Sequence, residues 1–338
     1  MSVFLELALP ALTSAVLCKA LLDWWLEVAP KLGFMGKDMN KPGEHFAAEA
    51  SGVWVVLSSV FGILLYIAIE VYTDKRSDVI PVLSITLTLL LAGLLGFFDD
   101  ILGWKKGISP LKRVFFTIPI SLPLIAVKAG YSTVDIPLVG VLDLGLLYPL
   151  LVVPVGVVGA SNAFNMIAGY NGLEALQGLT LLFFASVLLA LTNNLDAVYV
   201  VLPVASAIFV FYSLYNKYPA KAFPGNSFTY GFGAYYASLA IYWNFEKYAL
   251  YSFALYFLEL VLFIRGLLNK VYKENFGRVQ ADGSLLPPYN KSYSVTHLAI
   301  KIAMKLKGKC YERDVVKTIC ALQVVVCTLA LLATLLFK

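Results

Sequence analysis

The chain has 338 residues, of which 60% are hydrophobic and only 14% are charged, and its formal net charge is +5. Soluble domains carry about 25% charged residues, so the composition excludes an ordinary soluble domain and predicts one integral membrane domain over residues 1–338. A net charge of this size gives no indication of a nucleic-acid partner.

The spacing of apolar runs predicts the fold. A bilayer core about 30 Å thick needs roughly 20 apolar residues per helix. The sequence accordingly predicts ten transmembrane helices, at 3–28, 52–72, 79–98, 111–129, 144–164, 174–192, 196–214, 228–244, 248–268 and 315–337. Segment 130–143 alternates polar and apolar residues, which predicts a short hairpin. The expected fold is all-α, with ten transmembrane helices and one short outer hairpin.

Lys and Arg gather on one set of loops. Loops 31–50, 99–113, 215–227 and 265–317 hold 20 of the 26 basic residues. Basic loops stay cytoplasmic, so we expect Asp99 and Asp100 to face the cytoplasm and both termini to lie outside. The cytoplasmic loops are then 31–50, 99–113, 165–173, 215–227 and 269–314. Within the last, segment Thr296–Lys309 places Leu298, Ile302 and Leu306 on one face, which predicts a helix lying in the membrane interface.

The first cytoplasmic loop contains the block Gly33-Phe-Met-Gly-Lys37-Asp38-Met-Asn40-Lys41, and Glu49-Ala-Ser-Gly52 opens the second predicted helix. By itself, this basic block is typical of an anchor on the cytoplasmic side of a membrane.

Asp99 and Asp100 end the apolar run 79–98, and a basic segment that contains Lys105, Lys106, Lys112 and Arg113 follows. Carboxylates at a membrane boundary are costly to desolvate and mark an ion or substrate site more often than a fold requirement. One such pair alone is equally compatible with a solvated helix terminus. An ion-coupled transporter is a further alternative, but it predicts polar residues near the bilayer midplane and repeated broken helices, which this sequence lacks.

Three asparagines occur within ten residues in Asn162-Ala-Phe-Asn165-Met-Ile-Ala-Gly169-Tyr-Asn171-Gly-Leu-Glu174. Residues three and four apart share a helix face, so the first two asparagines and Gly169 are expected to form one polar stripe. Amide oxygens there suit a hard cation. Asn171 and Glu174 have the spacing of a capping box, and a capped helix N-terminus also binds anions.

The segment from Tyr218 to Ser227 contains two prolines and a glycine, which mark a turn before the eighth predicted helix. In that turn Phe223 has the chemistry to stack on a base, and Asn226 has an oxygen to offer a metal. Alone, the segment is a loop with turn residues.

Together and in this order, these four blocks resemble the polyprenyl-phosphate N-acetylhexosamine-1-phosphate transferases, most of all the dolichyl-phosphate GlcNAc-1-phosphotransferase branch that begins N-glycosylation, which has archaeal members. NAFNMIAGYNGLEALQG and GFFDDILG carry the resemblance, and LDLGLLY and KDMNK support that branch. The resemblance implies an enzyme that moves GlcNAc-1-phosphate from UDP-GlcNAc to a dolichyl-type polyprenyl phosphate and releases UMP. It also implies a fold of ten transmembrane helices around a cytoplasmic cleft and Mg²⁺ as cofactor. The location it implies is the cell membrane in an archaeon or the ER membrane in a eukaryote. A homodimer is common among relatives.

The resemblance also implies roles for individual residues. Asn165 and Asn226 would be the magnesium ligands. The residues that would bind substrates, with Phe223 stacking on uracil, are Lys37, Asp38, Asn40, Lys41, Glu49, Asn162, Gly169, Asn171, Glu174 and Phe223. The residues that would act on the phosphates are Asp99, Asp100, Lys112 (with Lys106 as a competitor) and Arg278.

The sequence departs from the family pattern at two places. The family usually has Asp where this chain has Asn226, which keeps an oxygen but lacks the charge. We therefore expect weaker metal binding, and a weakened, engineered or inactive UDP-sugar-binding homologue is an alternative. The basic segment near Arg278 also lacks the family's histidine, and we expect His297, about twenty residues later, to be an interfacial residue and not a catalytic one.

Overall fold

The computed structural model describes residues 3–73, 79–102, 110–136, 140–271 and 273–336. The helices are α1 (Val3–Leu32), α2 (Gly52–Tyr72), α3 (Val79–Leu102), α4 (Pro110–Thr117), η1 (Ile118–Ser121), α5 (Leu122–Ala126), η2 (Tyr148–Val152), α6 (Val153–Met166), α7 (Leu173–Leu191), α8 (Ala197–Phe211), η3 (Tyr212–Asn216), α9 (Gly225–Tyr242), α10 (Glu246–Ser252), α11 (Ala254–Leu268), α12 (Val295–Lys307) and α13 (Glu312–Leu336). The strands form antiparallel pairs: β1 (Met35–Lys37) with β2 (Phe46–Ala48), β3 (Thr133–Ile136) with β4 (Gly140–Asp143), and β5 (Arg278–Val279) with β6 (Leu285–Leu286).

The long helices identify an integral membrane protein, as the composition predicted. Within the described residues, seven helical segments are long and apolar enough to cross a membrane, and an eighth is the pair α10 and α11, bent by 54°. The all-α class is therefore confirmed, whereas the count of ten crossings stays a prediction. Each of the ten predicted segments does coincide with helical structure.

Two predicted transmembrane segments, 111–129 and 228–244, are not among these eight. Segment 111–129 is divided among α4, η1 and α5. Helix α9 is buried along nearly its whole length, from Ser227 to Ile241, and packs against α2, α3 and α6. Because α9 meets other helices on all sides, it has no need of the continuous apolar surface that lipid contact requires.

The start of α9 is wedged between α2 and α3 because glycines leave room for it. A Cβ at Gly52 in α2 would collide with the carbonyl oxygen of Pro224, and one at Gly96 in α3 would collide with that of Asn226. Gly225 has a φ of +67°, a conformation that favours glycine, and its Cα lies against the Asp100 carboxylate. The glycines thus bring the first turn of α9 against the end of α3.

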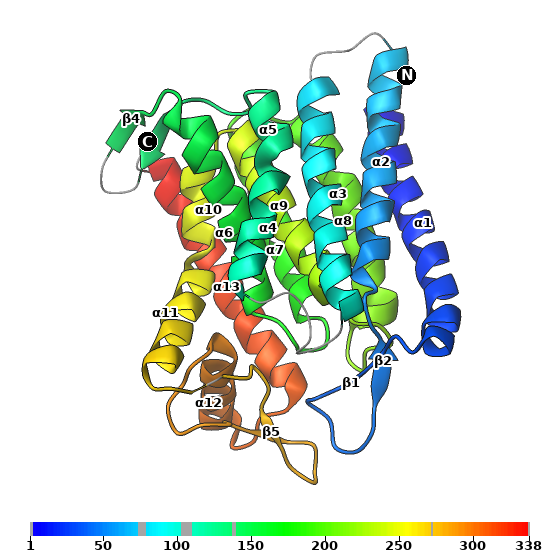
Figure 1. Cartoon of the computed structure of the whole chain (residues 1–338), viewed down its shortest axis with the longest axis vertical. Coiled ribbons are helices and arrows are strands. Elements are labelled where there is room, and N and C mark those ends of the chain that lie inside the picture. Colours follow the sequence, from blue (N-terminus) through cyan, green and yellow to red (C-terminus); the bar gives the residue numbers. More distant parts are fainter. Residues whose placement is uncertain (1–2, 74–78, 103–109, 137–139, 272, 337–338) are drawn as a thin grey trace.

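The two ends of the bundle differ in character (Figure 1). The hairpin β3–β4 and the outer ends of α1 and α13 lie at the upper end in this view, whereas β1, β2, β5 and α12 lie at the lower end. We call the lower end, which carries the segments 33–51, 167–172, 217–224 and 269–294, the loop end. The predicted hairpin at 130–143 is confirmed, with Thr133 opposite Asp143.

The predicted helix in the last loop is also confirmed, as α12. Ser294 caps its N-terminus by accepting a hydrogen bond from the Thr296 N–H, and Gly308 ends it with a φ of +79°. Ile302 and Leu306 point outward, being 40% and 77% exposed. His297 lies on the buried side, so the expectation that it is interfacial is wrong: its ring accepts from the Tyr293 N–H and bonds to the Glu274 carbonyl.

Candidate active site

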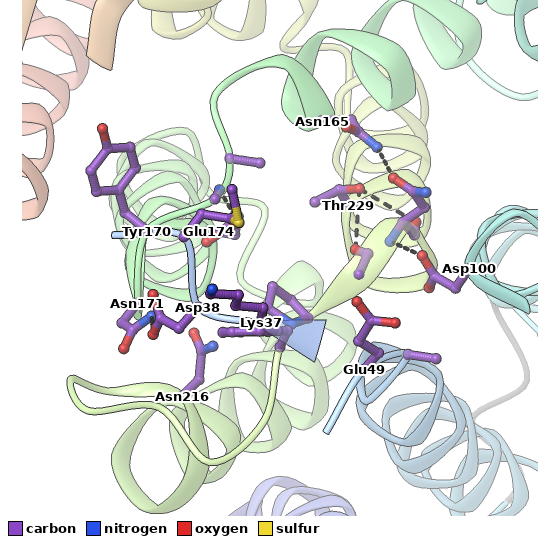
Figure 2. Close-up of a pocket in the computed structure, with 18 of the residues that line it drawn as sticks. Lys37, Asp38, Glu49, Asp100, Asn165, Tyr170, Asn171, Glu174, Asn216 and Thr229 are labelled. Carbon is purple, nitrogen blue, oxygen red and sulfur yellow. Dashed lines mark hydrogen bonds between the residues drawn. The ribbon is translucent and has the colours of Figure 1, made fainter. Parts of the chain in front are cut away.

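A cavity of about 350 Å³ lies at the loop end of the bundle and gathers most of the predicted site residues (Figure 2). Its size is in the range of small-molecule sites. Eleven of the sixteen predicted residues line it: Lys37, Asp38, Glu49, Asp99, Asp100, Asn165, Gly169, Asn171, Glu174, Phe223 and Asn226. Blocks that are far apart in the sequence therefore meet at one place, as the four-block pattern predicted.

On one side of the cavity, Asp99, Asp100, Asn165 and Asn226 form what we call the carboxylate cluster. Asp100 accepts hydrogen bonds from the backbone N–H groups of Asn226 (2.7 Å) and Ser227 (3.0 Å), so its carboxylate caps the N-terminus of α9. The Asn226 amide donates to Asp99 (3.1 Å) and accepts from the amide of Asn165 (2.5 Å). A helix N-terminus favours negative charge, which helps to keep both carboxylates so close together.

Asp99 is almost fully buried and binds further groups besides Asn226. Its Oδ2 lies 3.1 Å from the Arg113 guanidinium and accepts from the Tyr230 hydroxyl at 3.1 Å. A buried carboxylate needs such partners because desolvation of an unpaired charge costs several kcal/mol. In the described structure the cation paired with Asp99 is Arg113, whereas its neighbour Lys112 is exposed.

The donor set of the carboxylate cluster fits a hard divalent cation. It offers two carboxylates and two amide side chains, which are joined by hydrogen bonds through Asn226, and Mg²⁺ prefers oxygen ligands. In the described part of the chain no group of three or more His, Cys, Asp and Glu side chains is arranged for a metal. The carboxylate cluster has only two such side chains, Asp99 and Asp100, because Asn165 and Asn226 are amides.

The other side of the cavity is built from loops around Asn171. Asp38, Lys41, Asn171 and Glu312 form what we call the loop network. Asn171 accepts from Lys41 (2.6 Å) and from the Ala220 N–H (2.8 Å), and it donates to Asp38 (3.0 Å). Its backbone N–H donates to Glu312 at 2.7 Å, and Lys41 forms an ion pair with Asp38. In Figure 2, Asp38 and Asn171 lie across the cavity from Asp100.

The turn before α7 does not have the predicted capping box. Gly172, with a φ of +84°, separates Asn171 from the helix, and no side chain caps α7. Glu174 instead accepts from the backbone N–H of Gly169 at 2.8 Å. Gly169 has a φ of +104°, and the Phe276 ring packs so closely on it that a Cβ would have to displace the ring. This turn is thus shaped by a buried acid and an aromatic ring.

Five predicted residues do not line the cavity. Asn40 and Lys41 are buried just behind it, where Asn40 donates to the Gly169 carbonyl. Asn162 donates to the Val158 carbonyl within α6. Because α6 ends at Met166, the predicted stripe does not extend to Gly169. Lys112 and Arg278 are exposed. The alternative Lys106 lies outside the described residues.

Charge is distributed unevenly around the cavity. Lys37 is the only Lys or Arg that lines it in the described part of the chain, and five carboxylates line it as well. One of these, Glu49, packs under Gly36, and desolvation raises its pKa above the ordinary value. An anionic ligand in this cavity would therefore need either a metal ion or protons to offset the carboxylates.

Arg113, Phe276 and Glu312 were not singled out from the sequence. Arg113 stood beside Lys112, and only the geometry separates the two. Glu312 is an acid at the start of an apolar run, as Asp99 and Asp100 are acids at the end of one, so the same rule about carboxylates at membrane boundaries would have flagged it. Phe276 carries no sequence signal of this kind.

Comparison with known proteins places this fold and site in the class of membrane glycosyl-1-phosphate transferases. Residues 82–244 match the family model described as glycosyl transferase family 4. The chain is 33% identical over 304 residues to a protein of Saccharolobus solfataricus, covering 88% of this chain and 89% of the relative. It is 31% identical over 310 residues to one of Sulfolobus acidocaldarius, covering 91% and 90%.

Both archaeal relatives are named provisionally as UDP-N-acetylglucosamine–dolichyl-phosphate N-acetylglucosaminephosphotransferases. A Dictyostelium discoideum protein that carries the same name is 24% identical over 307 residues, covering 78% of this chain and 71% of the relative. The chain belongs to glycosyl transferase family 4, and the resemblance drawn from its motifs is confirmed.

Proposed function

We propose that this protein transfers GlcNAc-1-phosphate from UDP-GlcNAc to a dolichyl-type polyprenyl phosphate, giving a lipid-linked diphosphate sugar and UMP. The observation that carries the proposal is the meeting of the carboxylate cluster and the loop network around one cavity at the end of an apolar bundle. The names of the archaeal relatives give the donor and the acceptor. This reaction is the first step of lipid-linked oligosaccharide assembly.

The reaction joins two anionic substrates. An oxygen of the lipid phosphate attacks the phosphorus that bears the sugar, a new P–O bond forms, and the bond to the bridging oxygen breaks, so that this oxygen leaves on UMP. A phosphate monoester has a second pKa near 6, so the nucleophile is already largely ionised at neutral pH. Catalysis then depends on positioning and on neutralising charge more than on a base.

We assign Asp99 and Asp100 to the orientation of the acceptor phosphate. The backbone N–H groups of α9 fix Asp100, and Arg113 and Tyr230 fix Asp99. Arg113 is the cation nearest these acids in the described structure, so it replaces Lys112 as our choice for the basic residue on the acceptor side. The exposed Arg278 does not line the cavity.

We assign the side of the cavity that adjoins the loop network, which we call the donor side, to the UDP-sugar. Phe223 and Gly169 line the cavity and offer a ring face and an open backbone to a uracil base. Lys37 is placed between the two sides in Figure 2, where its ammonium group can meet a diphosphate. The contacts of Asp38, Asn40, Lys41 and Asn171 to one another hold this side in shape.

A magnesium ion is part of the proposal. Asn165 and Asn226, with Asp99 or Asp100, supply the oxygens that would hold it. When bound, it would neutralise phosphate charge that Lys37 alone cannot balance. Asn226 contributes an oxygen without charge, and this favours a second candidate function, a UDP-sugar-binding homologue with weak or no turnover.

The orientation follows from charge. The loop end carries most of the basic residues, so we assign it to the cytoplasm and both termini to the outer side. If the cell is archaeal, like the sources of the two most similar relatives reported above, the membrane is the cell membrane. The test replaces one exposed residue at each end with cysteine, Lys309→Cys or Tyr131→Cys, and labels intact cells with a thiol reagent that does not cross the membrane. We expect label only at position 131.

The activity test uses the purified full-length chain in detergent or nanodiscs with labelled UDP-GlcNAc, dolichyl phosphate and Mg²⁺. We expect a lipid-linked GlcNAc diphosphate by mass spectrometry and an equal amount of UMP, both lost with EDTA. UDP-GlcNAc binding without either product would select the inactive homologue. Product from another UDP-sugar, but not from UDP-GlcNAc, would overturn the donor assignment while retaining the reaction class.

A further inference from the structure

Glu312 is a buried acid for which the proposed reaction has no direct use. It is the first residue of α13, it is 2% exposed, and it does not line the cavity. Its Oε1 accepts the backbone N–H of Asn171 at 2.7 Å. Its Oε2 lies 3.5 Å from the Lys41 ammonium group. A carboxylate is seldom buried so completely without a specific role, because its desolvation is costly.

Asn171, which Glu312 contacts, is already committed to protein partners. Its side-chain oxygen accepts two hydrogen bonds, from Lys41 and from the Ala220 N–H, and its amide nitrogen donates to Asp38. A carbonyl oxygen has two lone pairs, so this oxygen has no free acceptor site for a ligand. Asn171 therefore joins the loops that form the donor side and has little capacity left for the donor itself.

The loops joined in this way carry the groups that face the cavity. The turn at Asn171 includes Gly169, and the segment at Ala220 leads directly to Phe223. Glu312 attaches the turn at Asn171 to the last long helix, 141 residues further along the chain, and Asn171 in turn bonds to the segment at Ala220. The Tyr218 ring in the same segment lies under Lys41 and Arg313. The first residues of α13 thus contact the loops of the donor side on the face turned away from the cavity.

We infer that Glu312 is a positioning residue that acts through Lys41 and Asn171 to keep the donor side of the cavity in its binding shape. This inference rests on the proposed function, which assigns that side of the cavity to the UDP-sugar. In the described structure Glu312 bonds to Asn171 and pairs with Lys41, whereas the acids of the acceptor side are fixed by α9 and Arg113. Loss of Glu312 should therefore weaken donor binding selectively.

The test compares Glu312→Ala, Glu312→Gln and the matched control Asp314→Asn in the full-length protein. Asp314 lies two residues further along α13 and bonds to Lys307 and the Tyr311 N–H, away from the loop network. Glu312→Gln keeps an oxygen for the Asn171 N–H but removes the charge next to Lys41. KM for each substrate and kcat are measured from UMP release, and UDP affinity is measured by calorimetry without acceptor.

We expect Glu312→Ala to raise the donor KM and the Kd for UDP about tenfold, the usual effect of losing a hydrogen bond to a charged group. Glu312→Gln should produce a smaller rise, and the acceptor KM and the Asp314→Asn variant should stay within about twofold of wild type. Unchanged donor KM and UDP affinity in both Glu312 variants would overturn the inference, as would an equal loss for both substrates. An inactive wild-type protein would instead count against the proposed reaction, and UDP calorimetry would still test the role of Glu312.

Discussion

The two sides of the cavity solve the problem of buried acids differently. In the carboxylate cluster, adjacent acids at the end of one helix share the N-terminus of another, and Arg113 is the cation paired with Asp99. In the loop network, Asp38 and Glu312 come from opposite ends of the chain and share one buried lysine, Lys41. Asn171 then ties this lysine to the loops.

This difference indicates a division of labour. The carboxylate cluster faces the cavity with charges that a metal ion or a phosphate can meet, so its variants should affect turnover. The loop network directs its charges toward one another and toward backbone groups, so its variants should affect the shape of the donor side. Four predictions test this division, beginning with the largest expected effect.

Asp100→Asn should lower turnover by at least about a hundredfold, the usual effect of removing a group that stabilises charge in the transition state, while sparing UDP binding. UMP release and UDP calorimetry check it. The substitution also places an amide N–H against a backbone donor of α9, so the melting temperature must be recorded alongside. The exposed Asp282→Asn, at the same end of the molecule, is the control. An unchanged rate would remove Asp100 from the acceptor side.

Arg113→Gln should lower turnover by about tenfold or more, since Asp99 is buried and would lose a charged partner at 3.1 Å. Lys112→Gln, at the exposed neighbouring position, should have almost no effect. Parallel rate measurements on the two variants decide between them. A larger loss from Lys112→Gln would restore the residue that the sequence favoured and would contradict our choice of Arg113.

The contrast between these neighbours shows what the sequence could and could not reveal. Asp99 and Asp100 were found because carboxylates at a membrane boundary are costly to desolvate, and the three other polar blocks then favoured a site over a solvated helix terminus. Asn165 was found from its block, but Asn162, one helical turn earlier, does not line the cavity, and Gly169, the third residue of the predicted stripe, lies beyond the helix. The helix pattern predicts shared faces within α6, yet α6 ends at Met166, so the pattern says nothing about the turn that follows.

The loop network was the least predictable part because its contacts join segments that local patterns treat separately. Asp38, Asn40 and Lys41 were identified by resemblance as substrate contacts, whereas their partners are Asn171, Gly169 and each other. The capping-box spacing of Asn171 and Glu174 predicted a local bond that the αL turn at Gly172 prevents. The fold class, in contrast, follows from composition and span length alone, because lipid contact constrains nearly every helix.

Asn226→Asp should reduce the Mg²⁺ concentration for half-maximal activity about three- to tenfold, because a charged ligand attracts the cation more strongly than an amide. Without Mg²⁺ the same variant should melt at a lower temperature, since a third carboxylate would face Asp99 at the distance of the present 3.1 Å hydrogen bond. Asn162→Asp adds the same charge outside the cavity and is the control. Equal activity at limiting Mg²⁺ would exclude Asn226 from the metal's ligands.

The smallest expected effect concerns His297, which bonds to both ends of the segment 274–293 at the loop end. Burial lowers the pKa of His297 from 6.5 to about 4, and its Nδ1 accepts the Tyr293 N–H, a bond that protonation would abolish. A lowered pKa in the folded state means that the unfolded chain binds the proton first. The stability that His297 contributes is therefore complete above pH 6.5 and declines as the pH falls toward 4.

At pH 5.5 this loss is about 1 kcal/mol of unfolding free energy, and it should fall on the 274–293 segment that His297 holds. Wild type should show a lower apparent melting temperature at pH 5.5 than at pH 7.5, and His297→Gln should show a smaller difference. His45→Gln changes the other histidine, which is exposed, and should behave as wild type. The same pH sensitivity in His297→Gln would mean that other groups cause it. A pH dependence confined to His297 would show that the loop end is stabilised by a neutral histidine ring, in contrast to the charged partners of the carboxylate cluster.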